Sequence, residues 1–312
     1  MDDGTTQLKA LFDNISKVIL GKEKQTQLIV AAWLSDGHVL LEDVPGTGKT
    51  LLAKTIAKSV DMNFGRVQFT TDLLPSDIIG TTILDEEKKK LLFRKGPVFS
   101  TFFLGDEINR ATPRTQSALL ECMAERQVTV ENTTTKLDKL FFVIATQNPI
   151  EQHGTFPLPE AQLDRFSIRI SLGYPGRDAE IMMAKSRNTT NPFDHIGAVI
   201  GSEDIIKIKK IINEINISDS IYTYTMDIIE ATRKHPDCKL GASPRATLVL
   251  LKMAQALAYM SGDDFVRPAL IYNLSIPVLA HRIALTPESK YAGKNANDVI
   301  KDILQKIKAP IK

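Results

Sequence analysis

A short segment between residues 38 and 53, HVLLEDVPGTGKTLLA, constrains the fold of this chain more than any other. Its first part is apolar and predicts a buried strand, and its last part has the apolar periodicity of a helix. The turn between them is rich in glycine, so its backbone N–H groups can curl around an anion at the start of the helix. Strand, turn and helix in this order predict a phosphate-binding loop.

The residues of this loop have expected roles in binding a nucleotide. Lys49 would reach the β- and γ-phosphates, and the hydroxyl of Thr50 would bind Mg²⁺. The usual pattern has glycine where this chain has Asp43, so a tight turn with a surface lysine is the structural alternative. The loop residues expected to contact the nucleotide are Pro45, Gly46, Thr47, Gly48, Lys49, Thr50 and Leu51.

Composition limits the class of protein. The chain has 312 residues, 43% of them hydrophobic, which leaves room for two domains. A formal net charge of +2 argues against a strongly basic surface for nucleic acid. The two cysteines, Cys122 and Cys238, fit a reducing compartment, and the histidines stand singly, without the spacing of a metal site. Without a signal peptide or a long apolar run, we expect a cytoplasmic protein that does not enter a membrane.

Polar residues follow two predicted buried strands. Asp106 and Glu107 end the first, where Asp106 would hold the Mg²⁺ shell and Glu107 would activate the attacking water as a general base. Asn148 follows the second strand and would lie beside the γ-phosphate if that strand neighbours the others. Acids are common at strand ends and asparagine is common in turns, so each position also has a purely structural interpretation.

Two further positions leave alternatives open. Ile19, Leu20 and Gly21 form either a corner between helices or an apolar floor for adenine. Arg165 lies at a predicted helix–strand junction, where it could merely pair with a neighbouring acid, Asp164 or Glu160.

The chain has a β-rich first part and a helical second part. Residues 81–94 and 127–139 alternate like hairpins, the first around a charged tip. After residue 176 the strand signals fade, and we predict a nucleotide-binding domain at 1–190 and a helical domain at 191–312. The helices predicted in the second part cover residues 178–188, 203–214, 219–234, 244–260, 267–280 and 296–308.

These signals occur together and in one order, and the chain resembles the AAA+ ATPases, more closely their MoxR branch. The resemblance extends from about residue 18 to residue 310, and Asp43 fits this branch. The motifs that carry it are LLEDVPGTGKT, QFTTDLLPSDIIG, GPVF, DEINRATPRTQSALLECMAERQVTV, ATQNPIEQHGTFPLPEAQLDRF, GASPRA and RPALIYNLSIPVLAHR.

The resemblance implies an α/β fold with three layers, a parallel sheet of order 5-1-4-3-2 and an all-α C-terminal lid. It implies assembly into a homo-oligomeric ring, most simply a hexamer, with the ATP site between subunits. Asn148 would then sense the γ-phosphate, Arg165 would be an arginine finger reaching the neighbour's site, and Arg245 would touch the phosphates from the lid.

The function implied by the resemblance is an ATPase, converting ATP and water to ADP and phosphate, that remodels partner proteins like a chaperone. A partner with a von Willebrand factor A domain, and maturation, assembly or metal insertion, are inherited from the same resemblance. The alternatives are a nucleic-acid motor and a nucleotide-gated scaffold with little turnover. The two hairpins would either contact substrate at the ring's pore or face, or be solvent-exposed decoration.

Overall fold

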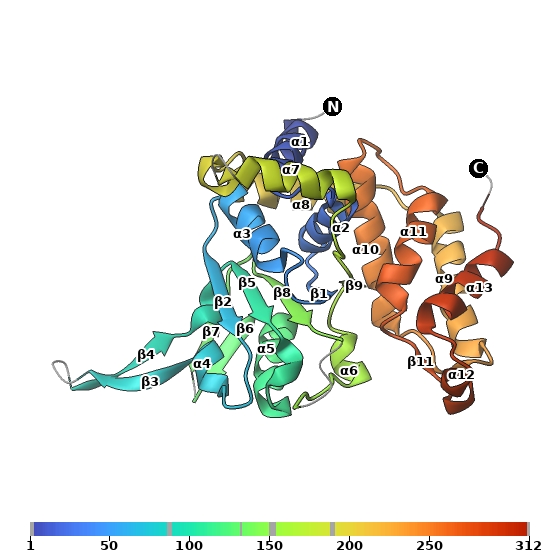
Figure 1. Cartoon of the computed structure of the whole chain (residues 1–312). Coiled ribbons are helices and arrows are strands. Elements are labelled where there is room, and N and C mark those ends of the chain that lie inside the picture. The colour runs from blue at the N-terminus through green and yellow to red at the C-terminus, as the bar shows by residue number, and fades with distance from the viewer. Residues whose placement is uncertain (1–2, 86–88, 132, 150–153, 188–190, 311–312) are drawn as a thin grey trace.

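The computed structural model describes residues 3–85, 89–131, 133–149, 154–187 and 191–310, and a five-stranded parallel sheet lies at its centre (Figure 1). In spatial order the strands are β2 (Phe64–Gln68), β5 (Phe102–Asp106), β8 (Phe142–Gln147), β1 (Val39–Glu42) and β9 (Ile168–Ile170). Counting only these five along the chain, this is the predicted order 5-1-4-3-2. The predicted fold class is confirmed.

Successive residues of a strand face opposite sides of the sheet, and here both sides are buried. Val39 and Leu41 of β1 belong to one apolar cluster, whereas Leu40 between them belongs to another. The first cluster continues into helices of the C-terminal part, and the helices before residue 60 that share it are α1 (Asp3–Ser16), α2 (Glu23–Leu34) and α3 (Lys49–Ser59). Those that share the second are α4 (Pro75–Ile79) and α5 (Pro113–Glu125). The result is the predicted three-layer arrangement.

A buried histidine ties the sheet to α5. The Nδ1 atom of His38 accepts a hydrogen bond from the Val143 amide at 3.0 Å, and its Nε2 atom lies 3.2 Å from the Met123 carbonyl oxygen. Burial lowers the pKa of His38 from 6.5 to about 3. The ring is therefore neutral, with Nε2–H donating to Met123.

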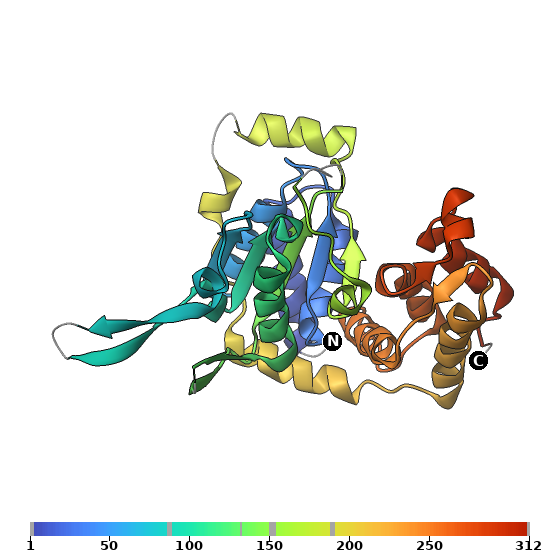
Figure 2. The same cartoon turned by 90° about the horizontal axis from the view of Figure 1, so that it is seen from below.

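Two antiparallel hairpins interrupt the core. The first pairs β3 (Gly80–Asp85) with β4 (Lys90–Lys95), and the second pairs β6 (Gln127–Val130) with β7 (Thr133–Lys136). The first extends far from the globular body, on the side opposite the C-terminal helices (Figure 2). Its predicted charged tip covers residues 85–90, and 86–88 of that tip, like residue 132 of the second hairpin, lie outside the described residues.

The C-terminal part is helical, with one exception that the sequence pattern did not reveal. Its helices are α9 (Asp219–Lys234), α10 (Pro244–Met260), α11 (Pro268–Leu279), α12 (Pro287–Tyr291) and α13 (Ala296–Lys306). The exception is a two-stranded antiparallel ribbon, β10 (Cys238–Leu240) with β11 (Ala284–Leu285). Strands of two or three residues are too short to show an alternating pattern.

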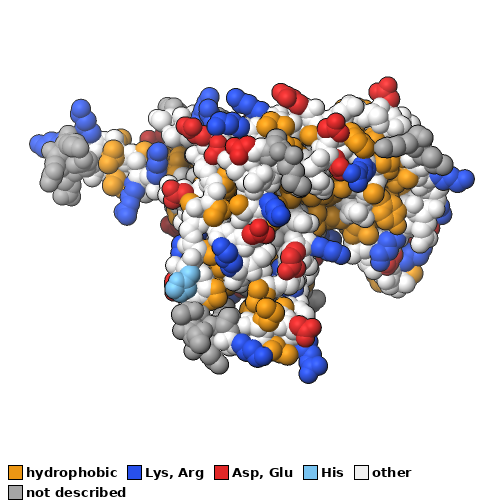
Figure 3. Space-filling view, turned by 90° about the horizontal axis from the view of Figure 1, so that it is seen from above, with side chains coloured by type: hydrophobic (Ala, Val, Ile, Leu, Met, Phe, Trp, Pro, Cys, Tyr) orange, Lys and Arg blue, Asp and Glu red, His pale blue; other side chains and the backbone are white. Residues whose placement is uncertain are grey.

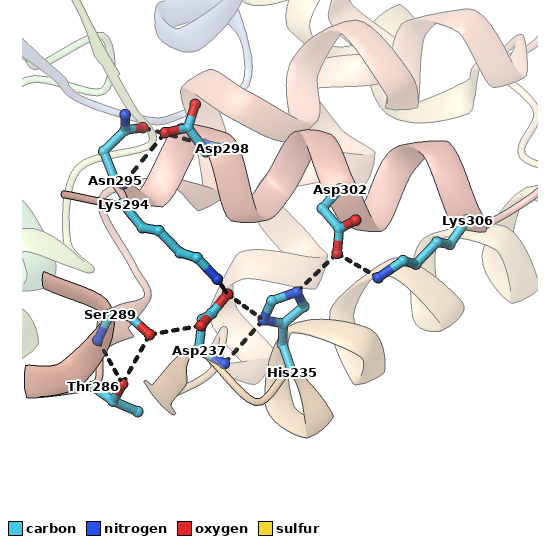
Figure 4. A network of polar contacts seen from close by, with 9 residues as sticks. All are labelled: His235, Asp237, Thr286, Ser289, Lys294, Asn295, Asp298, Asp302 and Lys306. Carbon is cyan, nitrogen blue, oxygen red and sulfur yellow. Dashed lines mark hydrogen bonds and ion pairs between the residues drawn. The ribbon is translucent and has the colours of Figure 1, made fainter. Parts of the chain in front are cut away.

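A chain of polar contacts fastens the ends of the lid helices together (Figure 4). His235, which follows α9, contacts Asp302 of α13 at 3.0 Å, and Lys306 contacts the same carboxylate at 2.6 Å. Asp237 accepts hydrogen bonds from Ser289 of α12 and from Lys294, at 2.6 and 2.7 Å. These pairs are partly exposed, so they set geometry more than they add stability.

The remaining helices connect the two parts. α6 (Glu160–Leu163) precedes β9, α7 (Arg177–Arg187) follows it, and α8 (Ser202–Glu214) packs against α2 of the core. Lys209 of α8 donates to the Trp33 carbonyl at 3.0 Å. The domain division at residue 190 stays a prediction. Within the described ranges, no helix is both long enough and apolar enough to cross a bilayer.

Candidate functional site

The turn between β1 and α3 has the backbone conformation of an anion-binding loop. Gly46 and Gly48 have φ angles of +85° and +87°, a region that other residues rarely adopt. The first hydrogen bond into α3 runs from the Leu52 amide to the Gly48 carbonyl. The N–H groups before Leu52 therefore have no carbonyl one turn back and face the open end of the helix.

Two charged residues shape this loop. The ammonium group of Lys49 lies inside the turn and donates to the carbonyls of Asp43 and Val44, both at 3.0 Å. It has three donors, so one remains for a phosphate. The ammonium group is therefore held against the backbone of the turn, and its role in binding phosphate stays a prediction.

Asp43, the residue that departs from the usual pattern, fastens the loop to β9. Its carboxylate accepts hydrogen bonds from the Ser171 hydroxyl and from the amides of Leu172 and Gly173, at 2.7, 2.6 and 2.9 Å. A glycine could not make these contacts. The sequence did not indicate this role, because the partners lie about 130 positions away.

A cavity of about 310 Å³ opens beside the loop. Ile19 and Leu20 form one wall, Leu172 and Tyr174 another, and Lys22 closes the corner by donating to the Leu172 and Tyr174 carbonyls at 2.6 Å each. The predicted nucleotide contacts that line it are Ile19, Leu20, Gly46, Thr47, Gly48 and Leu51. Gly21, Pro45, Lys49 and Thr50 do not line it, and Gly21 lies against Ala179 of α7. The apolar wall of the cavity suits a nucleotide base, and the glycines Gly46 and Gly48 on its lining suit phosphates.

Asp106 ends β5, two strands from β1, and its carboxylate is already oriented. The Thr146 hydroxyl donates to Oδ1 at 2.7 Å, and Arg66 of β2 pairs with Oδ2 at 2.8 Å. Arg66 is 45% exposed, so an incoming ligand could displace it at little cost.

Glu107 follows in a left-handed backbone conformation, with φ of +58°. Such a conformation is uncommon for a residue other than glycine, and it turns the side chain out of the line of the strand. The Glu107 amide donates to the Thr146 hydroxyl, while its carboxylate accepts from Gln68 at 2.7 Å and Arg110 at 3.0 Å. The sequence did not single out Arg66, Gln68 or Thr146.

Asn148 lies at the edge where a phosphate sensor is expected. It follows β8, which pairs with β1 on one side and β5 on the other. Its position is therefore between the loop and Asp106, and it is buried. The condition that the sequence left open, that its strand should neighbour the other two, is met.

Arg165 lies at the opposite edge of the sheet. It precedes β9, and the amide of Ser167, two residues later, donates to the His38 carbonyl just before β1 begins. The phosphate loop follows the other end of β1, four residues or about 13 Å away. Arg165 is therefore remote from the loop of its own subunit. No described ion pair joins it to Asp164 or Glu160, because Asp164 pairs with Arg282 at 2.9 Å.

Arg245 is near the same edge. It is exposed in the first turn of α10, whose capping residue Ser243 donates to both carboxylate oxygens of Asp164 at 3.0 Å. The structure thus places Arg245 beside the junction that carries Arg165, away from the cavity at the loop.

The residues present are suited to Mg²⁺ that enters with a nucleotide. Thr50 and Asp106 offer hydroxyl and carboxylate oxygens, the donors that this hard cation prefers. A carboxylate has about four acceptor positions, and Asp106 uses one for Arg66 and one for Thr146. Among the described residues there is no cluster of His, Cys, Asp or Glu that could hold a metal by itself.

Comparison with known proteins decides the family. A family model described as "ATPase family associated with various cellular activities (AAA)" matches residues 38–168, and one described as "AAA lid domain" matches residues 230–303. The Mycobacterium tuberculosis protein named chaperone MoxR1 is 37% identical over 97% of this chain and 82% of its own length. The chain belongs to the MoxR family of AAA+ ATPases.

Two further similarities extend over the whole molecule. The Bacillus subtilis protein YeaC is 43% identical over 96% of this chain and 93% of its own length. A crystal structure of a Cytophaga hutchinsonii protein matches with a TM-score of 0.92 and 39% identity, covering 99% of this chain and 96% of that one. The resemblance predicted from the motifs is confirmed. The individual roles of the site residues in this MoxR-family ATPase stay predictions.

Proposed function

We propose that this MoxR-family ATPase hydrolyses ATP in a ring and uses the energy to remodel partner proteins, as a chaperone does. The observation that carries the proposal is the meeting of three features at one edge of the sheet: the glycine loop with Lys49, the oriented pair Asp106 and Glu107, and Asn148 between them. A chaperone name on a relative that matches most of the chain supports the remodelling role.

The residues of one subunit would each have a separate role in binding and hydrolysing the nucleotide. The loop amides and Lys49 would hold the phosphates, while Thr50 and Asp106 would hold the Mg²⁺ that neutralises charge on them. Glu107, released from Gln68 and Arg110, would accept a proton from the attacking water. Asn148 would orient that water or contact the γ-phosphate.

Charge that develops on the transferred phosphoryl group needs several cations around it. Arg66 and Arg110 lie beside Asp106 and Glu107 of the same subunit, and Arg165 would be the arginine finger. Arg165 lies at the far end of the strands, so it would serve the site of a neighbouring subunit. Arg245, beside the same junction, would reach that neighbour too. A site shared in this way makes hydrolysis depend on assembly, most simply as a hexamer.

The first hairpin is a candidate contact for the remodelled protein. It stands clear of the body, with hydrophobic and basic side chains along its arms (Figure 3). Leu84 and Leu91, which pair across the two strands, are 63% and 70% exposed. Partners with a von Willebrand factor A domain, which the MoxR resemblance implies, are the first to test, in a cytoplasmic setting.

Replacing Leu84 and Leu91 together with serine tests this contact. Basal hydrolysis should be unchanged, because the hairpin lies away from the loop, whereas stimulation by a partner protein should fall. If a partner protein stimulates ATP hydrolysis by this variant as much as by wild type, the hairpin is solvent-exposed and does not contact the partner.

The shared site is tested by steady-state ATP hydrolysis against protein concentration, for wild type, Glu107→Gln and Arg165→Ala. Specific activity should rise with concentration, and each variant should lose about 100-fold or more, typical of a missing base or finger. A mixture of the two variants should regain activity, since some interfaces combine an intact Glu107 with a neighbour's intact Arg165. Activity that is independent of concentration and unaffected by Arg165→Ala would favour a nucleotide-gated scaffold.

A further inference from the structure

Arg282 is a buried arginine just beyond α11, remote in sequence from every residue proposed to act on ATP. Its side chain is 1% exposed. Burial lowers its pKa to about 10, and the neighbouring Asp164 carboxylate opposes that shift, so the guanidinium is charged at neutral pH. A buried charge is costly unless it is fully paired, which makes its partners informative.

Those partners lie on both sides of Arg165. The guanidinium donates to the Asp164 carboxylate at 2.9 Å and to the Asp164 carbonyl at 3.3 Å. It also donates to the carbonyls of Phe166 and Ser167, at 2.6 and 2.9 Å. Arg282 therefore holds the backbone just before and just after Arg165, and none of these hydrogen bonds goes to the Arg165 side chain. We name these contacts the Arg282 clamp.

The residue before Arg282 reinforces the clamp. His281 is buried, its pKa is lowered well below 6.5 by that burial, and its Nε2 atom lies 3.1 Å from the Phe166 carbonyl oxygen. The neutral ring donates its proton there. Two consecutive lid residues thus converge on one carbonyl of the helix–strand junction.

The clamp also reaches the lid helix that carries Arg245. The Asp164 carboxylate that pairs with Arg282 also accepts from Ser243, the capping residue of α10, whose hydroxyl lies 3.0 Å from both carboxylate oxygens and shares its one proton between them. One carboxylate therefore joins the junction bearing Arg165, the end of α11 and the start of α10. A movement of the lid would be transmitted to Arg165 through backbone contacts.

We propose that Arg282 is a positioning residue for Arg165: it fixes the backbone on both sides of the finger and so sets the finger's place in the neighbouring subunit's ATP site. The inference rests on the proposed function, because it requires Arg165 to act across an interface. Backbone carbonyls are held by a planar group with five donors, which neither lysine nor an apolar residue can reproduce.

The experiment compares Arg282→Met and Arg282→Lys with Arg165→Ala in the full chain. Ring assembly, binding of a fluorescent ATP analogue and steady-state hydrolysis are measured for each variant. Misplacing a catalytic group by about 1 Å can cost about 100-fold. We expect Arg282→Met to lower kcat by that order, with assembly and analogue affinity within about twofold of wild type, and Arg282→Lys to be intermediate. Arg267→Met, which removes an exposed lid arginine paired with Asp263, is the matched control and should keep full turnover.

Mixing Arg282→Met subunits with Glu107→Gln subunits tests whether Arg282 positions Arg165 or has only a general structural role. Arg282→Met subunits keep their own loop and Glu107, so a neighbour with an intact clamp should restore hydrolysis, as with Arg165→Ala. Three results would each overturn the inference. The mixture could stay inactive, both Arg282 variants could fail to assemble, or Arg282→Met could keep the wild-type kcat. If Arg165→Ala itself keeps wild-type turnover, the shared site fails and the inference fails with it. If only the Arg282 variants are normal, the proposed function stands and the inference alone is wrong.

Discussion

Two aspartate–arginine pairs hold opposite ends of the sheet, and they differ in how far water reaches them. At the phosphate edge, Asp106 pairs with Arg66, whose side chain is 45% exposed. At the other edge, Asp164 pairs with Arg282, whose side chain is 1% exposed and has four recorded protein acceptors besides that carboxylate.

The difference matches the role that we propose for each edge. An acid that must exchange its partner for a nucleotide and its metal needs contacts that are cheap to break, and exposed ion pairs are cheap. Under the proposed function, the junction would present an arginine to another subunit, and that role needs contacts that persist. A buried pair is suited to this, because losing one partner strands the other charge away from water.

The largest expected effect is on the free energy of unfolding, when the arginine of each pair is replaced with methionine. Arg282→Met should lower the free energy of unfolding by about 3–5 kcal/mol, because the Asp164 carboxylate and four carbonyls lose their donor. Arg66→Met, the matched change at the phosphate edge, should cost only about 0–1 kcal/mol. Urea denaturation of both variants measures the difference. Equal losses would show that exposure does not separate the two edges.

A smaller effect, driven by pH, tests whether burial also governs a histidine at the same end of the strands as Arg165. His38 has a folded pKa of about 3 against an ordinary value of 6.5. The unfolded chain therefore binds the proton first, so this stability is present above pH 6.5 and is lost as pH falls from there toward 3. Between pH 6.5 and pH 5 the loss should be about 2 kcal/mol for His38.

Urea denaturation at several pH values measures that slope, with His38→Gln as the comparison. The glutamine variant should be less stable at pH 7.5 but should lose less on acidification, because it cannot be protonated in this range. Slopes that are the same for both proteins would exclude His38 as the source. His281, whose pKa is also lowered, should add to the slope in both.

Much of the phosphate edge was predictable because its residues are neighbours in the chain or end consecutive strands of the core. Gly46 to Thr50 form one turn, and Asp106 and Asn148 stand where apolar runs stop. In a parallel sheet these ends meet at one edge, so strand order was enough to bring them together. What could not be predicted is their local support: Thr146, Arg66 and Gln68 contact the acids through side chains whose directions no sequence pattern describes.

The amino-acid sequence by itself determined the residues of the phosphate loop and the motifs of the family, since each depends on local pattern, and the resemblance carried by those motifs implied the order of the strands. The tertiary structure decided the parts that depend on distant segments meeting. Asp43 binds residues near position 172, and Asp164 binds Arg282, 118 positions later. It also placed Arg165 and Arg245 at the edge away from their own loop. Such contacts follow from the pairing of β9 with β1 and from how the lid packs on β9, and packing is settled only when the whole chain has folded.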